Sequence, residues 1–261
     1  MKNSILKGLL LSLVTLLSLV TLLSLTLSVQ AAEAKPDSLA DVWVMIPNPG
    51  QEAQFETAFK KHIQFRAEKG DARDWKVYRP VIGTRMDRYI VRYCCTKWND
   101  VDAYQKWQSD NKILEHWYAN VDQYIARYEH FYTRVDFANS HWPEEQAYRY
   151  FAVTDYRVKM GSWRDVEAMK KVLSDSAKAM KWPYSWSWGQ RIGGKGGLSL
   201  VIPYKNYAEM TPPDSSFAQA LAKHMGNEGK AEELLEDWSE NFKSTTYTVY
   251  RLVDEMSMQS K

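Results

Sequence analysis

The sequence predicts an α+β protein in which two halves have the same order of elements, β-α-β-β-α-β. Both halves end on similar segments, Tyr132–Asp136 and Tyr250–Asp254. A glycine after a strand, a tryptophan that opens a strand and a glycine in a turn also recur at a constant offset of 111, as Gly50, Trp75 and Gly83 and again as Gly161, Trp186 and Gly194. In this split β-α-β order an antiparallel sheet packs against helices on one face. Two such halves can cover each other's open sheet faces, which gives a physical reason for the repetition.

The elements of the first half, residues 40–137, follow from local patterns. The apolar run Val42–Ile46 predicts a strand, because it is short and ends in a turn rich in proline and glycine. Phe55, Phe59 and Ile63 recur at helical spacing and predict a helix over residues 51–69. The remaining elements are expected in this order: strands at 75–82 and 86–96, a helix that begins near 99, a second helix that carries Ile113, Trp117, Val121, Tyr124 and Tyr128, and a strand at 131–137.

The second half, residues 148–255, repeats this order after a polar linker at 138–147. Val166, Met169 and Leu173 predict its first helix, with Ser162 as the N-terminal cap. The segment Gly189–Gly197 lies between two predicted strands and does not open a helix, so it predicts a hairpin connection and not a phosphate-binding loop. The other expected elements are strands at 148–158, 184–192, 198–203 and 245–253 and helices at 218–225 and 231–242.

Residues 1–32 predict a cleaved signal peptide. Lys2 and Lys7 precede an apolar run from Leu9 to Val29, and small residues follow this run. The run is about long enough to span a bilayer, so an uncleaved anchor is the alternative. We expect export to the periplasm or the extracellular space, with no stable membrane insertion after cleavage.

The charge balance gives no support to nucleic-acid binding. The formal net charge is +2, and the two lysines of the signal segment account for it, so the remaining chain has a formal net charge of 0. No run of basic residues offers a surface for phosphates.

Two neighbouring residues, Cys94 and Cys95, are the only cysteines of the chain. Adjacent side chains of a strand point to opposite faces of the sheet, so the sequence favours two buried thiols. A vicinal redox pair or a metal clip is the alternative, and no histidine or carboxylate at ligand spacing supports the metal.

On this repeated order of elements, over about residues 40–255, the chain resembles the dimeric α+β barrel superfamily, which includes antibiotic-biosynthesis monooxygenase, EthD-like and NIPSNAP-like proteins. It looks like a tandem, single-chain version of what is often a homodimer, with two ferredoxin-like halves packed as a pseudo-dimeric α+β barrel. The resemblance implies a cavity, either between the sheet and its helices or within the barrel, that accepts small apolar or aromatic molecules. Some relatives oxidise such molecules without a cofactor and others bind haem. A further homodimer is also left open.

Aromatic residues supply the candidate ligand-binding surface. All 11 Trp, 16 Tyr and 8 Phe lie outside the signal segment, so the folded part of the chain is rich in them. Flat rings with a polar atom suit an aromatic ligand, and the same rings can equally form the core or the contact between the halves. At the offset of 111, Arg73 and Val77 of the first half correspond to Tyr184 and Trp188, so we expect the site first in the second half. The candidate residues are Trp75, Tyr78, Tyr184, Trp186 and Trp188.

His62 and Arg92 are the candidates for catalysis. His62 lies beside the apolar stripe of the first predicted helix, where it is either a base or haem ligand that faces a cavity or a satisfied histidine at a helix–sheet boundary. Arg92 shares a strand face with Arg88, Ile90 and Cys94. On an inward face it would hold a carboxylate or phenolate, and a salt bridge is the alternative.

These observations favour an exported protein that binds a small apolar or aromatic molecule and carries no cofactor. The chain has no His-x-x-x-His, His-Glu-x-x-His or Gly-x-Ser-x-Gly motif, so no metal site and no hydrolase elbow are expected. One alternative is an enzyme of the same fold, either a cofactor-independent oxygenase or a haem-dependent one. Another is a non-enzymatic envelope or interaction protein whose aromatic residues form the core. Whether the protein is an enzyme is not decided by the sequence.

Overall fold

A computed structural model describes residues 38–142 and 147–259. The predicted signal segment lies outside the described residues. The first half contains β1 (Leu39–Pro47), α2 (Glu52–Glu68), β2 (Lys76–Ile82), β3 (Tyr89–Thr96), α3 (Trp98–Asp110), α4 (Ile113–Asn120) and β4 (Ile125–His141). The second half contains β5 (Tyr150–Val158), α5 (Trp163–Ala179), β6 (Trp186–Ile192), β7 (Gly197–Tyr204), α6 (Phe217–Met225), α7 (Glu228–Glu240) and β8 (Phe242–Leu252). β4 therefore continues to His141, into the segment predicted as a linker.

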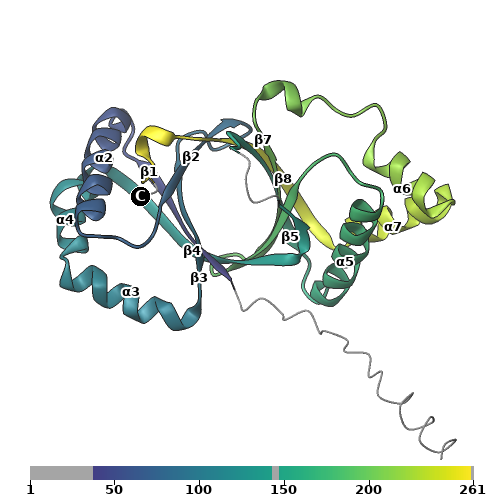
Figure 1. Ribbon diagram of the computed structural model, residues 1–261, viewed down its shortest axis with the longest axis horizontal. Helices are drawn as coiled ribbons and strands as arrows, with labels where there is room; N and C mark the ends of the chain where they lie inside the picture. Colours follow the sequence, from purple (N-terminus) through teal and green to yellow (C-terminus); the bar gives the residue numbers. More distant parts are fainter. Residues whose placement is uncertain (1–37, 143–146, 260–261) are drawn as a thin grey trace, which may run out of the picture. The chain divides into compact units, whose positions relative to one another are not determined.

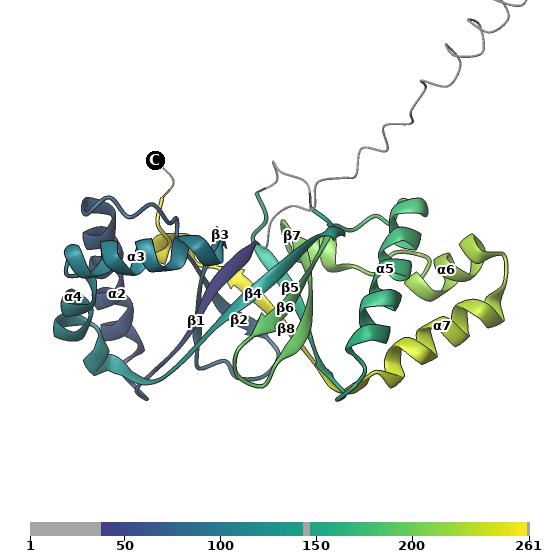
Figure 2. The same cartoon turned by 90° about the horizontal axis from the view of Figure 1, so that it is seen from below.

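The eight strands form one closed antiparallel barrel in the order β1-β3-β2-β8-β5-β7-β6-β4. Two pairings join the halves, β2 with β8 and β4 with β6. The helices α2, α3 and α4 lie outside the barrel on one side, and α5, α6 and α7 lie on the opposite side (Figures 1 and 2). The predicted fold class, an α+β barrel of two ferredoxin-like halves, is confirmed. Because the barrel closes, no described strand keeps a free edge that a second copy could extend.

The outward faces of the strands form a separate core with the helices of each half. In the first half Val77, Tyr89 and Val91 pack with Phe55 and Phe59 of α2. Tyr89 lies against Phe55 with 4.9 Å between the ring centroids. Alternation then directs the intervening residues of each strand into the barrel.

The first helix of the second half, α5, likewise covers large aromatic side chains. Trp186, Trp188 and Leu198 pack with Val166 and Leu173 of α5. None of the helices within residues 38–142 and 147–259 has both the length and the apolarity needed to cross a bilayer.

The helix predicted to extend as far as Tyr128 ends earlier. α4 stops at Asn120, and Tyr128 lies in β4, opposite Met45 of β1. The local pattern of apolar residues is helical, but β1 needs a partner on its second edge for the barrel to close. The pairing of β4 with β1 along the whole of β1 therefore overrides the local pattern.

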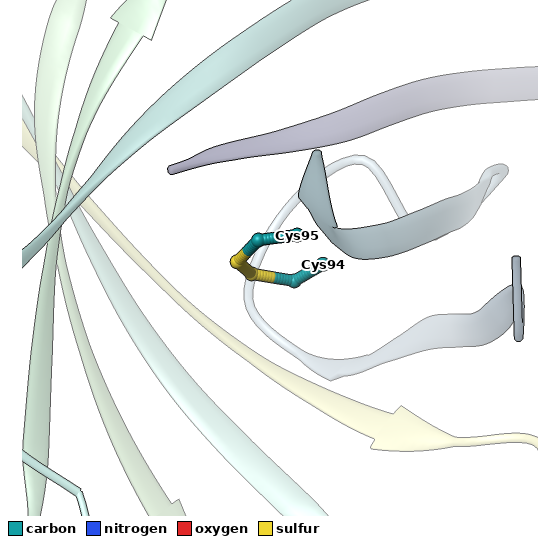
Figure 3. The surroundings of a disulfide bond; sticks show 2 residues. All are labelled: Cys94 and Cys95. Carbon is teal, nitrogen blue, oxygen red and sulfur yellow. A yellow bond between two sulfur atoms is a disulfide. The ribbon is translucent and has the colours of Figure 1, made fainter. Parts of the chain in front are cut away.

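Cys94 and Cys95 form a disulfide, so the expectation of two thiols is wrong (Figure 3). In β3 these two residues stand opposite the single Ala40 of β1, because Leu39 pairs with Thr96 and Asp41 pairs with Tyr93. Such a β-bulge interrupts the strict alternation on which the expectation rested. The two side chains can therefore bend toward one another.

Candidate functional site

A cavity of about 210 Å³ lies between the outer face of the first-half strands and the helices α2 and α4. Leu114 and Tyr118 line its solvent side, and they are 50% and 65% exposed. The rest of the wall is mostly aromatic and aliphatic. It is formed by Trp43, Met45, Phe59, His62, Ile63, Arg66, Trp75, Val91, Gln108, Ile113, Trp117, Asp122 and Tyr128.

His62 is a buried polar residue of this wall, as is Arg66, and it pairs with a second histidine. It is 2% exposed, and its Nδ1 lies 3.1 Å from Nδ1 of His116 on α4. The ring of His62 meets the ring of Trp117 edge to face at 5.0 Å, and His116 stacks on Phe65 at 4.0 Å. The contacts hold both imidazoles in fixed orientations between α2 and α4.

Both imidazoles are neutral at pH 7. Burial, followed by the nearby Arg66 and His116, lowers the pKa of His62 to about 3. Burial also lowers the pKa of His116. A hydrogen bond between two Nδ1 atoms needs one donor and one acceptor, so the two rings are opposite tautomers. No hydrogen bond from the described residues engages Nε2 of His62, which leaves this atom for a ligand.

Hydrogen bonds within the protein orient the aromatic wall. The indole Nε1 of Trp117 donates to the Tyr128 hydroxyl at 3.0 Å, and this hydroxyl donates to Asp122 at 2.7 Å. The indole Nε1 of Trp75 donates to the Tyr104 hydroxyl at 3.2 Å. Because these polar atoms are already paired, the two indoles offer only their carbon faces to a ligand.

Arg66 closes the inner end of the same network. Its Nε donates to Asp71 at 2.7 Å, and its Nη2 donates to the Tyr104 hydroxyl. The guanidinium carbon lies 5.6 Å from the centre of the Trp75 ring. Arg66 is therefore neutralised by Asp71 and shapes the cavity without adding a net charge to it.

The cavity does not fit haem. Its volume lies below the range of about 300–1,000 Å³ that is usual for pockets of drug-sized ligands, and haem is at least of that size. His62, the histidine on its wall, is tied through Nδ1 to a neutral histidine, without the carboxylate or carbonyl partner typical of a metal-bound imidazole. Among the described residues no group of three or more histidine, cysteine or acidic side chains is placed to hold a metal ion.

A second cavity, of about 320 Å³, lies at the end of β3 beside Cys95. Arg73 and Tyr104 line it, but the guanidinium of Arg73 is committed to protein groups. Its Nη1 donates to Asp41 at 2.6 Å, and its carbon lies 3.5 Å from the centre of the Tyr104 ring. His130 Nε2 lies 2.9 Å from the other oxygen of Asp41. We regard this cluster as structural.

Two of the residues proposed from the sequence, Trp75 and His62, meet in the 210 Å³ cavity. Trp186 and Trp188 are 6% and 5% exposed and belong to the second-half core. Their indole nitrogens donate to Asn139 O at 2.8 Å and to Ser174 Oγ at 3.0 Å. Tyr184 precedes β6 and donates to Thr211 O at 2.9 Å. Both cavities lie in the first half, where Val77 corresponds to Trp188.

Tyr78 and Arg92 lie elsewhere. Val77 and Val91 face the helices, and Tyr78 and Arg92 are their neighbours along β2 and β3. The side chains of Tyr78 and Arg92 therefore point to the opposite face, which is the inside of the barrel. The structure therefore separates the second catalytic candidate from the first. Neither residue lines the cavity that contains His62.

Sequence reasoning missed Trp43, Arg66, His116, Trp117 and Tyr128 as site residues. One signal was present, since His62 and Arg66 stand four residues apart and so share a helix face. No local signal indicates that α4 packs on α2, because that contact depends on how the two helices cover the barrel.

No protein-family model and no curated protein sequence matches the chain. Its fold is similar to several solved structures. A candidate monooxygenase from Lactobacillus acidophilus is 8% identical, with a TM-score of 0.53, over 85% of this chain and 96% of that one. An anthrone oxidase-like protein is 8% identical, with a TM-score of 0.50, over 84% and 93%. A chlorite dismutase mutant from Candidatus Nitrospira defluvii is 7% identical, with a TM-score of 0.51, over 84% and 93%. These structures share the dimeric α+β barrel fold, so the predicted resemblance is confirmed at the level of the fold.

Proposed function

We propose that this protein is exported and binds a small, neutral, aromatic molecule in the cavity of the first half. The observation that carries the proposal is the convergence of Trp43, Trp75 and Trp117 on one cavity. In it the buried His62 is uncharged and the buried Arg66 is paired with Asp71. A dry cavity of about 150 Å³ is large enough for benzene, so about 210 Å³ suits a ligand of one or two rings.

The free Nε2 of His62 adds one polar contact to this site. It accepts a hydrogen bond in one tautomer and donates one in the other, so a single hydroxyl or carbonyl group on the ligand suffices. A charged ligand would bring an unpaired charge into an apolar wall, which is costly. The proposal therefore favours phenol-like compounds over organic acids or amines.

Titration with 2-naphthol tests this proposal, through quenching of tryptophan fluorescence and through calorimetry. We expect saturable binding to the wild type and at least tenfold weaker binding to Ile63→Phe, because the added ring volume would fill the cavity. Val172→Phe is the matched control, since Val172 is 46% exposed on α5. The proposal is wrong if the wild type shows no saturable binding, or if Ile63→Phe binds as well as the control.

A second candidate function is oxygenation of a dihydroxy-aromatic substrate without a cofactor, which the names of the monooxygenase-like and oxidase-like neighbours suggest. Such chemistry needs a base for a phenol, and His62 is the histidine on the cavity wall. With the pKa of His62 at about 3, proton transfer from a phenol with an ordinary pKa near 10 is uphill by about 10 kcal/mol. This low pKa makes His62 a poor base for a phenol and therefore favours binding over oxygenation. Oxygen uptake with a catechol that is lost in His62→Leu would reverse this preference.

Export is part of the proposal and rests on the apolar segment at residues 1–32. The intact mass of protein recovered from the periplasm or medium is expected to correspond to a chain that begins near residue 32. A protein that stays in the membrane with its full mass would instead be anchored.

A homodimer also remains a proposal, and light scattering of the purified chain tests it.

A further inference from the structure

The interior of the barrel is a second, separate feature with binding chemistry. Its wall consists of the strand residues that alternate with the helix-covered ones, and neighbouring strands pair inner residues with one another. Arg92 of β3 stands opposite Val42, and Val42 stands opposite Phe131 of β4. Tyr78 of β2 meets Phe151 of β5 edge to face, with ring centroids 5.2 Å apart. The barrel interior is thus lined by aromatic rings beside an arginine.

Arg92 has no ionic partner among the described residues. Other arginines of the first half are paired with carboxylates: Arg66 with Asp71, Arg73 with Asp41, Arg79 with Glu56 and Arg88 with Asp87. No hydrogen bond or ion pair from the described residues engages the Arg92 guanidinium. An arginine remains charged in a protein, and a buried charge is normally paired.

The guanidinium of Arg92 is inside the barrel but not sealed from water. Burial lowers the pKa of Arg92, which places the group deep in the protein. Yet the side chain is only half-buried by accessible surface. Among the described residues no side-chain nitrogen or oxygen is both buried and without a partner. The donors of Arg92 must therefore face space inside the barrel that a small molecule or water can reach.

A second arginine adds to the positive charge of the interior. Arg191 of β6 lies with its guanidinium carbon 3.8 Å from the centre of the Phe131 ring. Asp155 of β5 is an acidic residue near Arg191, and burial raises its pKa while Arg191 and Arg85 act in the opposite direction. Arg191 and Arg85 thus lie near Asp155, whereas Arg92 has no carboxylate partner among the described residues, so a negative charge from a ligand would complement Arg92.

We propose that the barrel interior binds a small aromatic carboxylate, with the carboxylate on Arg92 and the ring against Tyr78 and Phe151. The planar guanidinium matches the two oxygens of a carboxylate, and this bidentate pairing is stronger than a single neutral hydrogen bond. Eight-stranded barrels have room inside for side chains or for one small ligand. This site differs from the first-half cavity in place and in the charge that it selects.

Calorimetric titration of the full chain with sodium benzoate tests the proposal, with benzyl alcohol as the neutral probe. We expect benzoate to bind at least tenfold more weakly to Arg92→Gln than to the wild type, and Arg92→Lys to retain part of the affinity through its charge. Arg79→Gln is the matched control, because it removes the same charge from the outer face of β2, where Arg79 pairs with Glu56. Its affinity should stay within twofold of the wild type.

Several results would overturn the proposal: no benzoate binding to the wild type at millimolar concentration, equal affinity in Arg92→Gln, or equal weakening in Arg79→Gln. If Arg92→Gln does not fold, Val153→Phe decides, because Val153 pairs with Val201 and Thr248 on the inner face and the variant keeps Arg92. Loss of benzoate binding there supports the site, and unchanged binding refutes it. Ile63→Phe should leave benzoate binding intact, and Arg92→Gln should leave 2-naphthol binding intact, so the two sites can fail independently.

Discussion

His62 and His116 share one hydrogen bond, Nδ1 to Nδ1 at 3.1 Å, across the contact between α2 and α4. This bond needs at least one neutral ring, because two protonated imidazoles have donors but no acceptor. The arrangement of this cavity wall therefore depends on the protonation state of the two histidines.

The stability of the protein should fall as the pH drops from neutral. The pKa of a histidine in an unfolded chain is about 6.5, whereas burial holds that of His62 at about 3. Between these values the unfolded chain binds more protons, so the stability is complete above about pH 6.5 and is lost as the pH falls toward 3. His62 alone should cost about 2 kcal/mol between pH 6.5 and about pH 5.

Urea unfolding at about pH 7 and about pH 5 measures this loss. His62→Leu, which introduces the residue found at Leu173 in α5, should reduce the difference between the two pH values by most of that amount. His224→Leu, on the exposed part of α6, should leave the difference unchanged. An equal pH dependence in both variants would show that His62 is not the responsible group.

Replacement of Trp188 by alanine should cost about 3–5 kcal/mol of unfolding free energy, because a side chain that is 5% exposed leaves a large void. Trp188→Phe should cost less, of order 1–3 kcal/mol, mainly through the lost bond to Ser174 Oγ. Denaturant titration gives both values. Trp98→Ala, at a side chain that is 43% exposed, is the comparison and should cost clearly less than Trp188→Ala.

Asp41→Asn should destabilise the protein by about 3–5 kcal/mol, since it leaves the buried Arg73 guanidinium without its carboxylate. The exposed pair Lys171–Asp175 provides the contrast. Asp175→Asn should change stability by about 0–1 kcal/mol. Equal effects of the two substitutions in urea unfolding would mean that the Arg73–Asp41 pair is not desolvated.

The disulfide between Cys94 and Cys95 should add little stability. It closes the smallest loop that a chain allows, and the entropic stabilisation grows with loop length. The double variant Cys94→Ala/Cys95→Ala is expected to lose on the order of 1 kcal/mol or less. Mass spectrometry after denaturation should find no alkylation without a reductant and two alkylated cysteines after reduction. Alkylation without a reductant would show free thiols.

The element order of both halves followed from local patterns, and these had physical causes. The spacing of Phe55, Phe59 and Ile63 is helical because those residues face one sheet. The glycines of the β6–β7 turn predict a hairpin because they adopt positive φ, as Gly194 does at 63°. The patterns failed at two places where pairing between distant strands decided the outcome. Tyr128 lies in β4 because β4 pairs with β1. At Cys94 and Cys95, the β-bulge opposite Ala40 sets the side-chain directions.

The sequence by itself determined the α+β class, the two-half order of elements and two members of the site, Trp75 and His62, because helix and strand periodicity is a local property of the chain. The tertiary structure decided that the cavity containing Trp75 and His62 lies in the first half. Trp188 packs in the second-half core and donates to Ser174 Oγ, whereas its counterpart Val77 packs in the first-half core. It also decided that His62 meets His116, 54 residues away, and that Arg92 faces the barrel interior without a carboxylate. These relationships depend on barrel closure and on the docking of α4 against α2. Neither can be predicted from the spacing of residues along the chain.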